Sequence, residues 1–298
     1  MPASTAFRPL RGTRIVSLAL NLPGPAALMR LRALGARCLK VEPPGPAPAV
    51  SGDPMGQYNP GAYGQMHDGI RSLTLDLKSE RGRAQLAREL ASADVLLTSF
   101  RPSALAKLGL GWRALHRAYP TLSLVEIVGA PGERAEEPGH DLTYLAEAGL
   151  VTGTELPPTL LADMAGALLA VEAALAALMQ ARASGRGVHR QVALSDAAHW
   201  LALPRNWGLT LPSGAVGGAH AGYRVYPCKD GRVAIAALEP HFASALFKVA
   251  GLPAPDLRAP LAPQARDAIA AWALGKTRQQ LDALARQHDI PLHTLPRA

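Results

Sequence analysis

Short apolar runs alternate with amphipathic stretches through the first two thirds of the chain. Arg14 to Leu20 predicts a buried strand, and Pro25 to Leu34 predicts a helix that ends at Gly35. Cys38 to Val41 then predicts the next strand, and a helix between two buried strands is typical of a parallel sheet. The same alternation predicts strands at 72–77, 94–98 and 122–128 and helices at 79–91, 102–108, 139–148, 163–183 and 194–203.

The pattern changes after a loop that contains Pro212 and several glycines. Two strands, at 223–226 and 232–236, flank Lys229-Asp-Gly, which predicts a hairpin. Helices are predicted at about 241–250, 263–274 and 277–287. We therefore expect an α/β domain over residues 1–210, built on a parallel sheet, followed by a smaller α+β domain over 217–298.

One long segment, residues 43–69, shows neither the helical nor the strand pattern of apolar residues. It is rich in proline and glycine, and it is expected to form a long loop. Long ordered loops in compact domains are usually functional.

Charge and composition limit the classes of partner. The formal net charge is +8, but the basic residues are scattered, and aromatic residues make up only 5% of the chain. No helix-turn-helix, zinc-finger or RNP pattern accompanies the charge, so we expect no nucleic-acid partner. The surplus fits either an arginine-rich surface or a site for a polyanionic cofactor such as coenzyme A. The turn Leu22-Pro-Gly-Pro lacks a GxGxxG fingerprint, which gives no support for a nicotinamide cofactor.

Other signals bear on compartment and metal content. Cys38 and Cys228 are far apart and lack partners at metal spacing, so neither a disulfide framework nor a metal site is expected. The first twenty residues carry arginines and no acid, loosely like a transit peptide, but a strand and a helix follow at once and we assign them to the fold. The apolar stretch from Ala165 to Met179 contains Glu172 and is too short to span a bilayer. A soluble, cytoplasmic protein with no membrane partner is expected.

An ordered series of short motifs runs through nearly the whole chain. The motifs occupy residues 10–18, 34–42, 71–78, 93–102, 107–111, 139–145, 157–166, 183–187, 192–196, 223–226 and 237–242. Together they resemble the superfamily of family III CoA-transferases and α-methylacyl-CoA racemases, the CaiB/BaiF type. The resemblance implies a Rossmann-like large domain, a small domain, and a homodimer of interlocked rings with active sites formed between subunits.

The resemblance also implies a catalytic pair. Removing an α-proton from a thioester needs a base on one face, a proton donor on the other and stabilisation of the enolate oxygen. His140 in Gly-His-Asp and the later Asp163 match the two opposed groups of the racemases. Asp163 precedes a long apolar helix, whose N–H groups and dipole could face the site, although a plain N-cap is the alternative. His140 could equally be a surface or capping histidine.

Two more acids match family positions. Asp141 is expected either to orient the imidazole of His140 or to act as a first-turn acid. Glu239 is expected near the histidine, supplied by the other domain, or else as an exposed acid after a strand.

Three functions stay open. The first is an acyl-CoA α-proton racemase or epimerase, with acyl-CoA as substrate and coenzyme A present only as part of it, with no covalently bound cofactor. The second is CoA transfer, in which Asp163 attacks the acyl-CoA and forms an aspartyl thioester. The transferases commonly carry an aromatic residue where this chain has His140, which favours the racemase. The third is a degenerate family member that binds a ligand or partner without turnover.

The chain departs from the family at basic positions. Pro43-Pro44 replaces a common Arg-Pro, and His67-Asp-Gly-Ile replaces a basic stretch before residue 71. The segment from Gly149 to Pro157 is short for a racemase. Family members usually continue beyond the point where this sequence ends and return to the large domain, so we expect the chain either to lack that return segment or to place its terminus differently. Arg71, Lys78 and Arg101 remain as candidates to bind the phosphates of coenzyme A.

Overall fold

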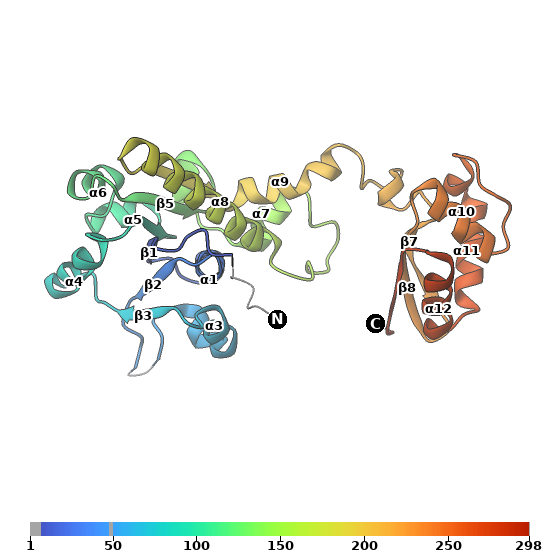
Figure 1. Cartoon of the computed structure of the whole chain (residues 1–298), viewed down its shortest axis with the longest axis horizontal. Coiled ribbons are helices and arrows are strands. Elements are labelled where there is room, and N and C mark those ends of the chain that lie inside the picture. Colours follow the sequence, from blue (N-terminus) through green and yellow to red (C-terminus); the bar gives the residue numbers. More distant parts are fainter. Residues whose placement is uncertain (1–6, 48–49, 298) are drawn as a thin grey trace. The chain divides into compact units, whose positions relative to one another are not determined.

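The structure, a computed structural model, describes residues 7–47 and 50–297. The chain forms two compact units, Met1–Ala202 and Leu203–Ala298, which we describe separately (Figure 1).

A parallel sheet organises the first unit. Within the described residues it has six strands in the order β3-β2-β1-β4-β5-β6, with every neighbouring pair parallel. The strands are β1 (Arg14–Ser17), β2 (Arg37–Glu42), β3 (Arg71–Thr74), β4 (Val95–Thr98), β5 (Ser123–Val128) and β6 (His189–Ala193). This is the doubly wound order, whose switch point lies between β1 and β4. The predicted α/β class is confirmed.

Helices cover both faces of this sheet because its strands are apolar on both sides. Ile15 and Val125 face one core, and their neighbours Val16 and Leu124 face the other. The first core includes residues of α1 (Pro23–Ala33), α7 (Asp141–Glu147), α8 (Leu161–Ser184) and α9 (Leu194–Asn206). The second includes residues of α4 (Glu80–Leu90), α5 (Pro102–Lys107) and α6 (Trp112–Ala118).

The segment predicted as a loop over 43–69 instead contains two short helices, α2 (Pro54–Tyr58) and α3 (Pro60–Met66). Asp53 caps α2 by accepting a hydrogen bond from the Met55 N–H, and Asn59 caps α3 in the same way through the Ala62 N–H. Proline follows each cap, at a position where its missing N–H costs nothing. The Asp-Pro and Asn-Pro pairs were therefore helix-start signals, although the glycines inside both helices obscured them.

The helix α8 is longer than the apolar stretch from Ala165 to Met179, which was predicted to be too short to span a bilayer. It has 24 residues and is long and apolar enough to cross a membrane. A buried face of alanines and glycine, including Gly166 and Ala170, packs in the core beside α1 and β5. Such an alanine-rich face lets the helix approach its neighbours closely, as in the core helix of a globular unit.

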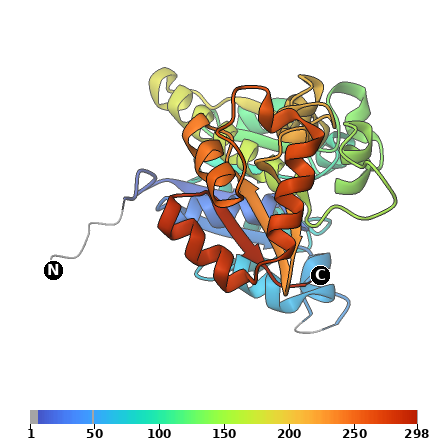
Figure 2. The same cartoon turned by 90° about the vertical axis from the view of Figure 1, so that its right-hand side faces the viewer.

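The second unit pairs a small antiparallel sheet with helices. Its described strands are β7 (Tyr223–Cys228), β8 (Gly231–Ala236) and β9 (Leu292–Leu295), in that order. The hairpin predicted around Asp230 joins β7 and β8, and it is confirmed. The predicted helices form α10 (Pro240–Val249), α11 (Pro263–Leu274) and α12 (Arg278–His288) (Figure 2, orange to red). Sequence periodicity missed β9, which has only four residues, and also α6 and β6 in the first unit.

Candidate active site

A cavity of about 170 Å³ opens at the carboxyl ends of the central strands, at the switch point of the sheet. In a doubly wound fold this crevice is the usual place for a ligand. The lining residues come from segments that follow β1, β4 and β5 and from the starts of α7 and α8. They include Leu20, Asn21, Ser99, Arg101, Gly129, Glu137, His140, Tyr144 and Asp163.

His140 lies at the point where an extended segment turns into α7. Its backbone is extended, and as the N-cap residue its main chain bonds to the side-chain hydroxyl of Thr143 in the first turn. The His140 N–H donates to Oγ1 of Thr143 at 3.1 Å, and the Thr143 hydroxyl donates to the His140 carbonyl at 2.7 Å. The side chain is exposed on the wall of the cavity. The turn therefore fixes the backbone of His140 and leaves its imidazole accessible to a ligand.

Asp163 is the third residue of α8, and the N-cap of that helix is Leu160. The alternative that Asp163 is a plain N-cap is therefore wrong, although its place in the first helical turn was predicted. Oδ1 of Asp141 accepts a hydrogen bond from the Asp163 N–H at 2.9 Å. Asp141 is 4% exposed and lies in the first turn of α7. One buried carboxylate thus ties the start of α8 to the start of α7 and orders both cavity residues.

The Asp163 carboxyl group has an unusual proton affinity. Its pKa is raised from 3.8 to about 6, mainly by burial and also by the nearby Asp141 carboxylate, while His140 opposes the shift. At neutral pH a carboxyl group with this pKa is mostly ionised, yet it accepts a proton more readily than an ordinary aspartate. Asp163 can therefore exchange protons with a bound molecule near neutrality.

Tyr144 is a cavity residue that we did not predict. Its hydroxyl packs against Gly129 and Gly139, where an added Cβ would overlap it. Burial raises the pKa of the phenol, and the Asp163 charge adds to the shift. The hydroxyl is therefore a hydrogen-bond donor beside the acid–base pair. The available signal was the spacing of four residues from His140, which places both side chains on one face of a helix.

Asn21 was also missed. It has a left-handed backbone with φ of 63°, which is uncommon for a residue other than glycine. Its N–H donates to Oδ1 of Asp53 at 3.0 Å, and Oδ2 of Asp53 pairs with Nζ of Lys40 at 2.6 Å. Both side chains of that ion pair are fully buried. The turn on one wall of the cavity is thus held by a buried charge pair from β2 and the segment before α2, a contact that sequence pattern does not reveal.

The predicted phosphate-binding residues do not lie together. Arg101 lines the cavity with His140. Arg71 begins β3 and donates to Oε1 of Glu89 at 2.8 Å, away from the cavity lining. Lys78 is exposed in the turn before α4. These roles stay predictions.

Glu239 lies in the second unit. It is exposed and precedes α10 as its N-cap. Its predicted place beside the histidine rests on the resemblance alone, as does the homodimer.

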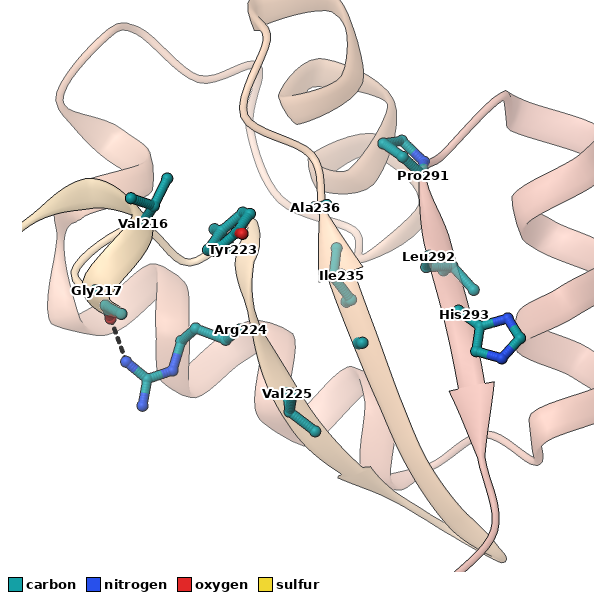
Figure 3. Close-up of a pocket in the computed structure, with 12 residues that line it drawn as sticks. Val216, Gly217, Tyr223, Arg224, Val225, Ile235, Ala236, Pro291, Leu292 and His293 are labelled. Atoms are coloured by element: carbon teal, nitrogen blue, oxygen red, sulfur yellow. Dashed lines mark hydrogen bonds between the residues drawn. The ribbon is translucent and has the colours of Figure 1, made fainter. Parts of the chain in front are cut away.

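The second unit has an apolar cavity of its own, of about 690 Å³, lined by residues of β7, β8 and β9 (Figure 3). Tyr223 and Val225 of β7 lie across from Ala236 and Ala234 of β8, and His293 of β9 lies beside Ala234. Arg224 donates to the Gly218 carbonyl at the rim. Among the residues that the structure describes, no carboxylate lines this larger cavity, so it lacks the acid–base pair of the switch-point cavity.

Fold and cavity together define an α/β protein with acid–base side chains at the switch point of a doubly wound sheet. Residues 10–297 match the profile of CoA-transferase family III. The chain belongs to this family, whose members are CoA-transferases or acyl-CoA racemases, and the predicted family is confirmed.

Relatives of both kinds are similar to the chain. "Probable fatty acyl-CoA transferase Rv3272" of Mycobacterium tuberculosis is 35% identical over 66% of this chain and 53% of the relative. Human "Alpha-methylacyl-CoA racemase" is 32% identical over 83% of this chain and 66% of the relative. The crystal structure of the hypothetical protein Rv3272 superposes with a TM-score of 0.80 at 27% identity, covering 96% of this chain and 85% of that one. The chain thus spans about half to two thirds of the length of these two curated relatives.

Proposed function

We propose that the protein is an acyl-CoA racemase or epimerase that moves the α-proton of a 2-substituted acyl thioester. The observation that carries the proposal is that His140 and Asp163 line one cavity, on the first turns of two different helices. Two acid–base groups on separate elements can approach one carbon atom from different sides, which a two-base mechanism requires.

In this mechanism one of the two groups takes the α-proton, and the electron pair of the C–H bond moves into the thioester as an enolate. The other group, protonated beforehand, returns a proton to the opposite face of the same carbon. Configuration inverts, no other bond breaks, and exchange with solvent restores the starting protonation states. The raised pKa of Asp163, about 6, supports its part in both directions, because a stronger base leaves a smaller gap to the weakly acidic α-carbon.

The enolate oxygen needs a donor as its charge develops. The Tyr144 hydroxyl and the Arg101 guanidinium both line the cavity and can donate. We assign that role to Tyr144, because its position against Gly129 and Gly139 is fixed by packing.

CoA transfer is the second candidate, and two observations favour it. The relatives include succinyl-CoA–D-citramalate CoA-transferase of Chloroflexus aurantiacus, 30% identical over 95% of this chain. Asp163 is also a carboxylate accessible from a cavity, as a nucleophile must be. In that reaction Asp163 displaces coenzyme A to form a mixed anhydride, and the thiolate then attacks the aspartyl carbonyl to release the acyl carboxylate. His140 has no necessary part in these steps.

One experiment separates the two reactions. The protein is incubated with a 2-methylacyl-CoA in deuterated water, and α-deuterium is followed by mass spectrometry, with a carboxylate acceptor in a parallel reaction. We expect deuterium incorporation in wild type, and a fall of roughly 10²- to 10⁴-fold in both His140→Ala and Asp163→Ala. His199→Ala, which removes a histidine outside the cavity lining, is the matched control and should exchange normally. Acyl transfer without deuterium incorporation, lost in Asp163→Ala but kept in His140→Ala, would replace racemisation with transfer.

A further inference from the structure

A large polar groove of the first unit lies at the opposite edge of the sheet from His140. It has a volume of about 1040 Å³. Three arginines in its lining begin neighbouring strands: Arg14 in β1, Arg37 in β2 and Arg71 in β3. Because all these strands are parallel, their first residues share the amino edge, whereas the cavity with His140 lies at the carboxyl edge. The groove is therefore separate from the proposed active site.

Within the described part of the chain, six arginines and one carboxylate line this groove. The arginines are Arg8, Arg11, Arg14, Arg32, Arg37 and Arg71. The carboxylate, Glu89, is shared by Arg71 at 2.8 Å and Arg14 at 3.7 Å. Over residues 7–47 and 50–297 no carboxylate pairs with the other four. So many like charges around one hollow create a positive potential that attracts anions.

Local packing holds two of the unpaired arginines over the groove. Gly69 has φ of 63°, and an added Cβ there would overlap the Arg32 guanidinium. Gly35 has φ of 100°, and its added Cβ would meet the Arg8 side chain at 2.8 Å. The glycines thus let the guanidinium of Arg32 and the first side-chain carbon of Arg8 lie directly on the backbone. The Arg32 guanidinium, held in this way, loses less conformational entropy on binding than a free surface side chain.

We propose that this groove binds a ligand that carries two or more linked phosphate groups. The planar guanidinium offers paired donors that match phosphate oxygens, and such charge-assisted bonds are among the strongest hydrogen bonds in proteins. No aromatic side chain lines the groove within the described residues, so it recognises the phosphates and offers no stacking surface for a base. Burial raises the pKa of the Cys38 thiol in the lining to about 12, so the thiol stays protonated and the groove is a binding site without a nucleophile.

Calorimetry with inorganic pyrophosphate as the probe tests the proposal on the whole chain. We expect one site per chain, with an affinity that falls as salt rises, since exposed charge contacts are screened. The double variant Arg32→Gln/Arg37→Gln should weaken binding about tenfold or more, and Arg8→Gln/Arg11→Gln, which lies outside the strands, should weaken it likewise. The second pair keeps the test valid if the first pair affects folding.

The control pair is Arg113→Gln/Arg117→Gln on α6. It removes the same charge from exposed arginines outside the groove and should change affinity by less than about twofold. Equal losses of affinity in the control pair and the groove pairs would overturn the proposal, since the effect would then be one of net charge alone. Absence of pyrophosphate binding to the wild-type protein would overturn it as well.

Two further arms identify the source of the phosphates. If the ligand is a nucleotide or coenzyme A, ADP or coenzyme A should displace pyrophosphate, and the groove variants should weaken both. If the ligand is a free polyphosphate, tripolyphosphate should bind more tightly than pyrophosphate, and ADP should compete poorly. The proposal does not depend on the reaction at His140, because the binding measurement needs no turnover.

Discussion

The two edges of the large sheet differ in how far their ion pairs are buried. At the carboxyl edge the ion pair of Lys40 and Asp53 is fully buried, and it supports the turn of Asn21. At the amino edge Glu89, whose side chain is 15% exposed, pairs with Arg71, whose side chain is 60% exposed, so solvent reaches this pair through the arginine. A buried pair penalises the loss of either partner strongly, whereas an exposed pair contributes little. The comparison shows that the buried ion pair at the carboxyl edge stabilises the geometry of the site. The pair at the amino edge leaves its arginine accessible to solvent.

The largest expected effect on stability is at the buried pair. Lys40→Met removes the cation and leaves the Asp53 carboxylate buried without its partner, which should lower the free energy of unfolding by about 3–5 kcal/mol. Urea denaturation measures the change. The double variant Lys40→Met/Asp53→Leu should recover part of it, because the unpaired carboxylate at position 53 is then removed as well. A cost below about 1 kcal/mol for the single variant would contradict the contrast between the edges.

The next largest effect is expected from the pH dependence of catalysis at Asp163, at the carboxyl edge. Because burial raises the pKa of Asp163 to about 6, its carboxylate form decreases about tenfold for each pH unit below that value. The kcat/KM for deuterium exchange should therefore fall about tenfold for each pH unit below about pH 6. A profile that stays flat down to pH 4 would show that Asp163 is not the base.

The same shift affects stability with a defined sign. The folded pKa of Asp163 lies above its unfolded value of 3.8, so its contribution to folding is complete below that value and is lost as pH rises through about 6. Asp163→Asn removes this dependence and serves as the control in denaturation at several pH values.

Tyr144 should have a smaller effect on catalysis. Tyr144→Phe removes the donor near the developing enolate and should lower kcat for exchange by roughly tenfold to a hundredfold, with little change in KM. Tyr119→Phe, whose hydroxyl bonds to the Ala87 carbonyl outside the cavity, is the matched control. Equal kcat in wild type and Tyr144→Phe would remove the hydroxyl from the mechanism.

The smallest effect is expected at the exposed pair. Glu89→Gln should change the free energy of unfolding by less than about 1 kcal/mol, since solvent screens its two arginines. It should also tighten pyrophosphate binding, because it removes the negative charge from the groove lining. Urea denaturation and calorimetry on the same sample check both statements, and a loss of several kcal/mol would erase the contrast with Lys40.

Local pattern predicted most of the large sheet because buried strands and amphipathic helices carry their own periodicity. It failed where segments are short or polar. β6 starts with the exposed residues His189 to Gln191, so it shows no apolar run. The helices α2 and α3 have five and seven residues, too few for a periodicity to appear. His140 and Asp163 became candidates through the resemblance to the family, because a single histidine or a helix-start aspartate says little by itself.

The sequence by itself predicted the parallel α/β class from local periodicity. It indicated the family, and through that resemblance the candidacy of His140 and Asp163, from an ordered series of motifs along nearly the whole chain. Only the tertiary structure showed that Asp141 bonds to the backbone of Asp163, that Tyr144 packs between two glycines, and that arginines from several segments line one groove. These contacts join residues that are distant in sequence or depend on the curvature of the backbone. No local preference specifies them, because they arise when the sheet brings the ends of its strands together.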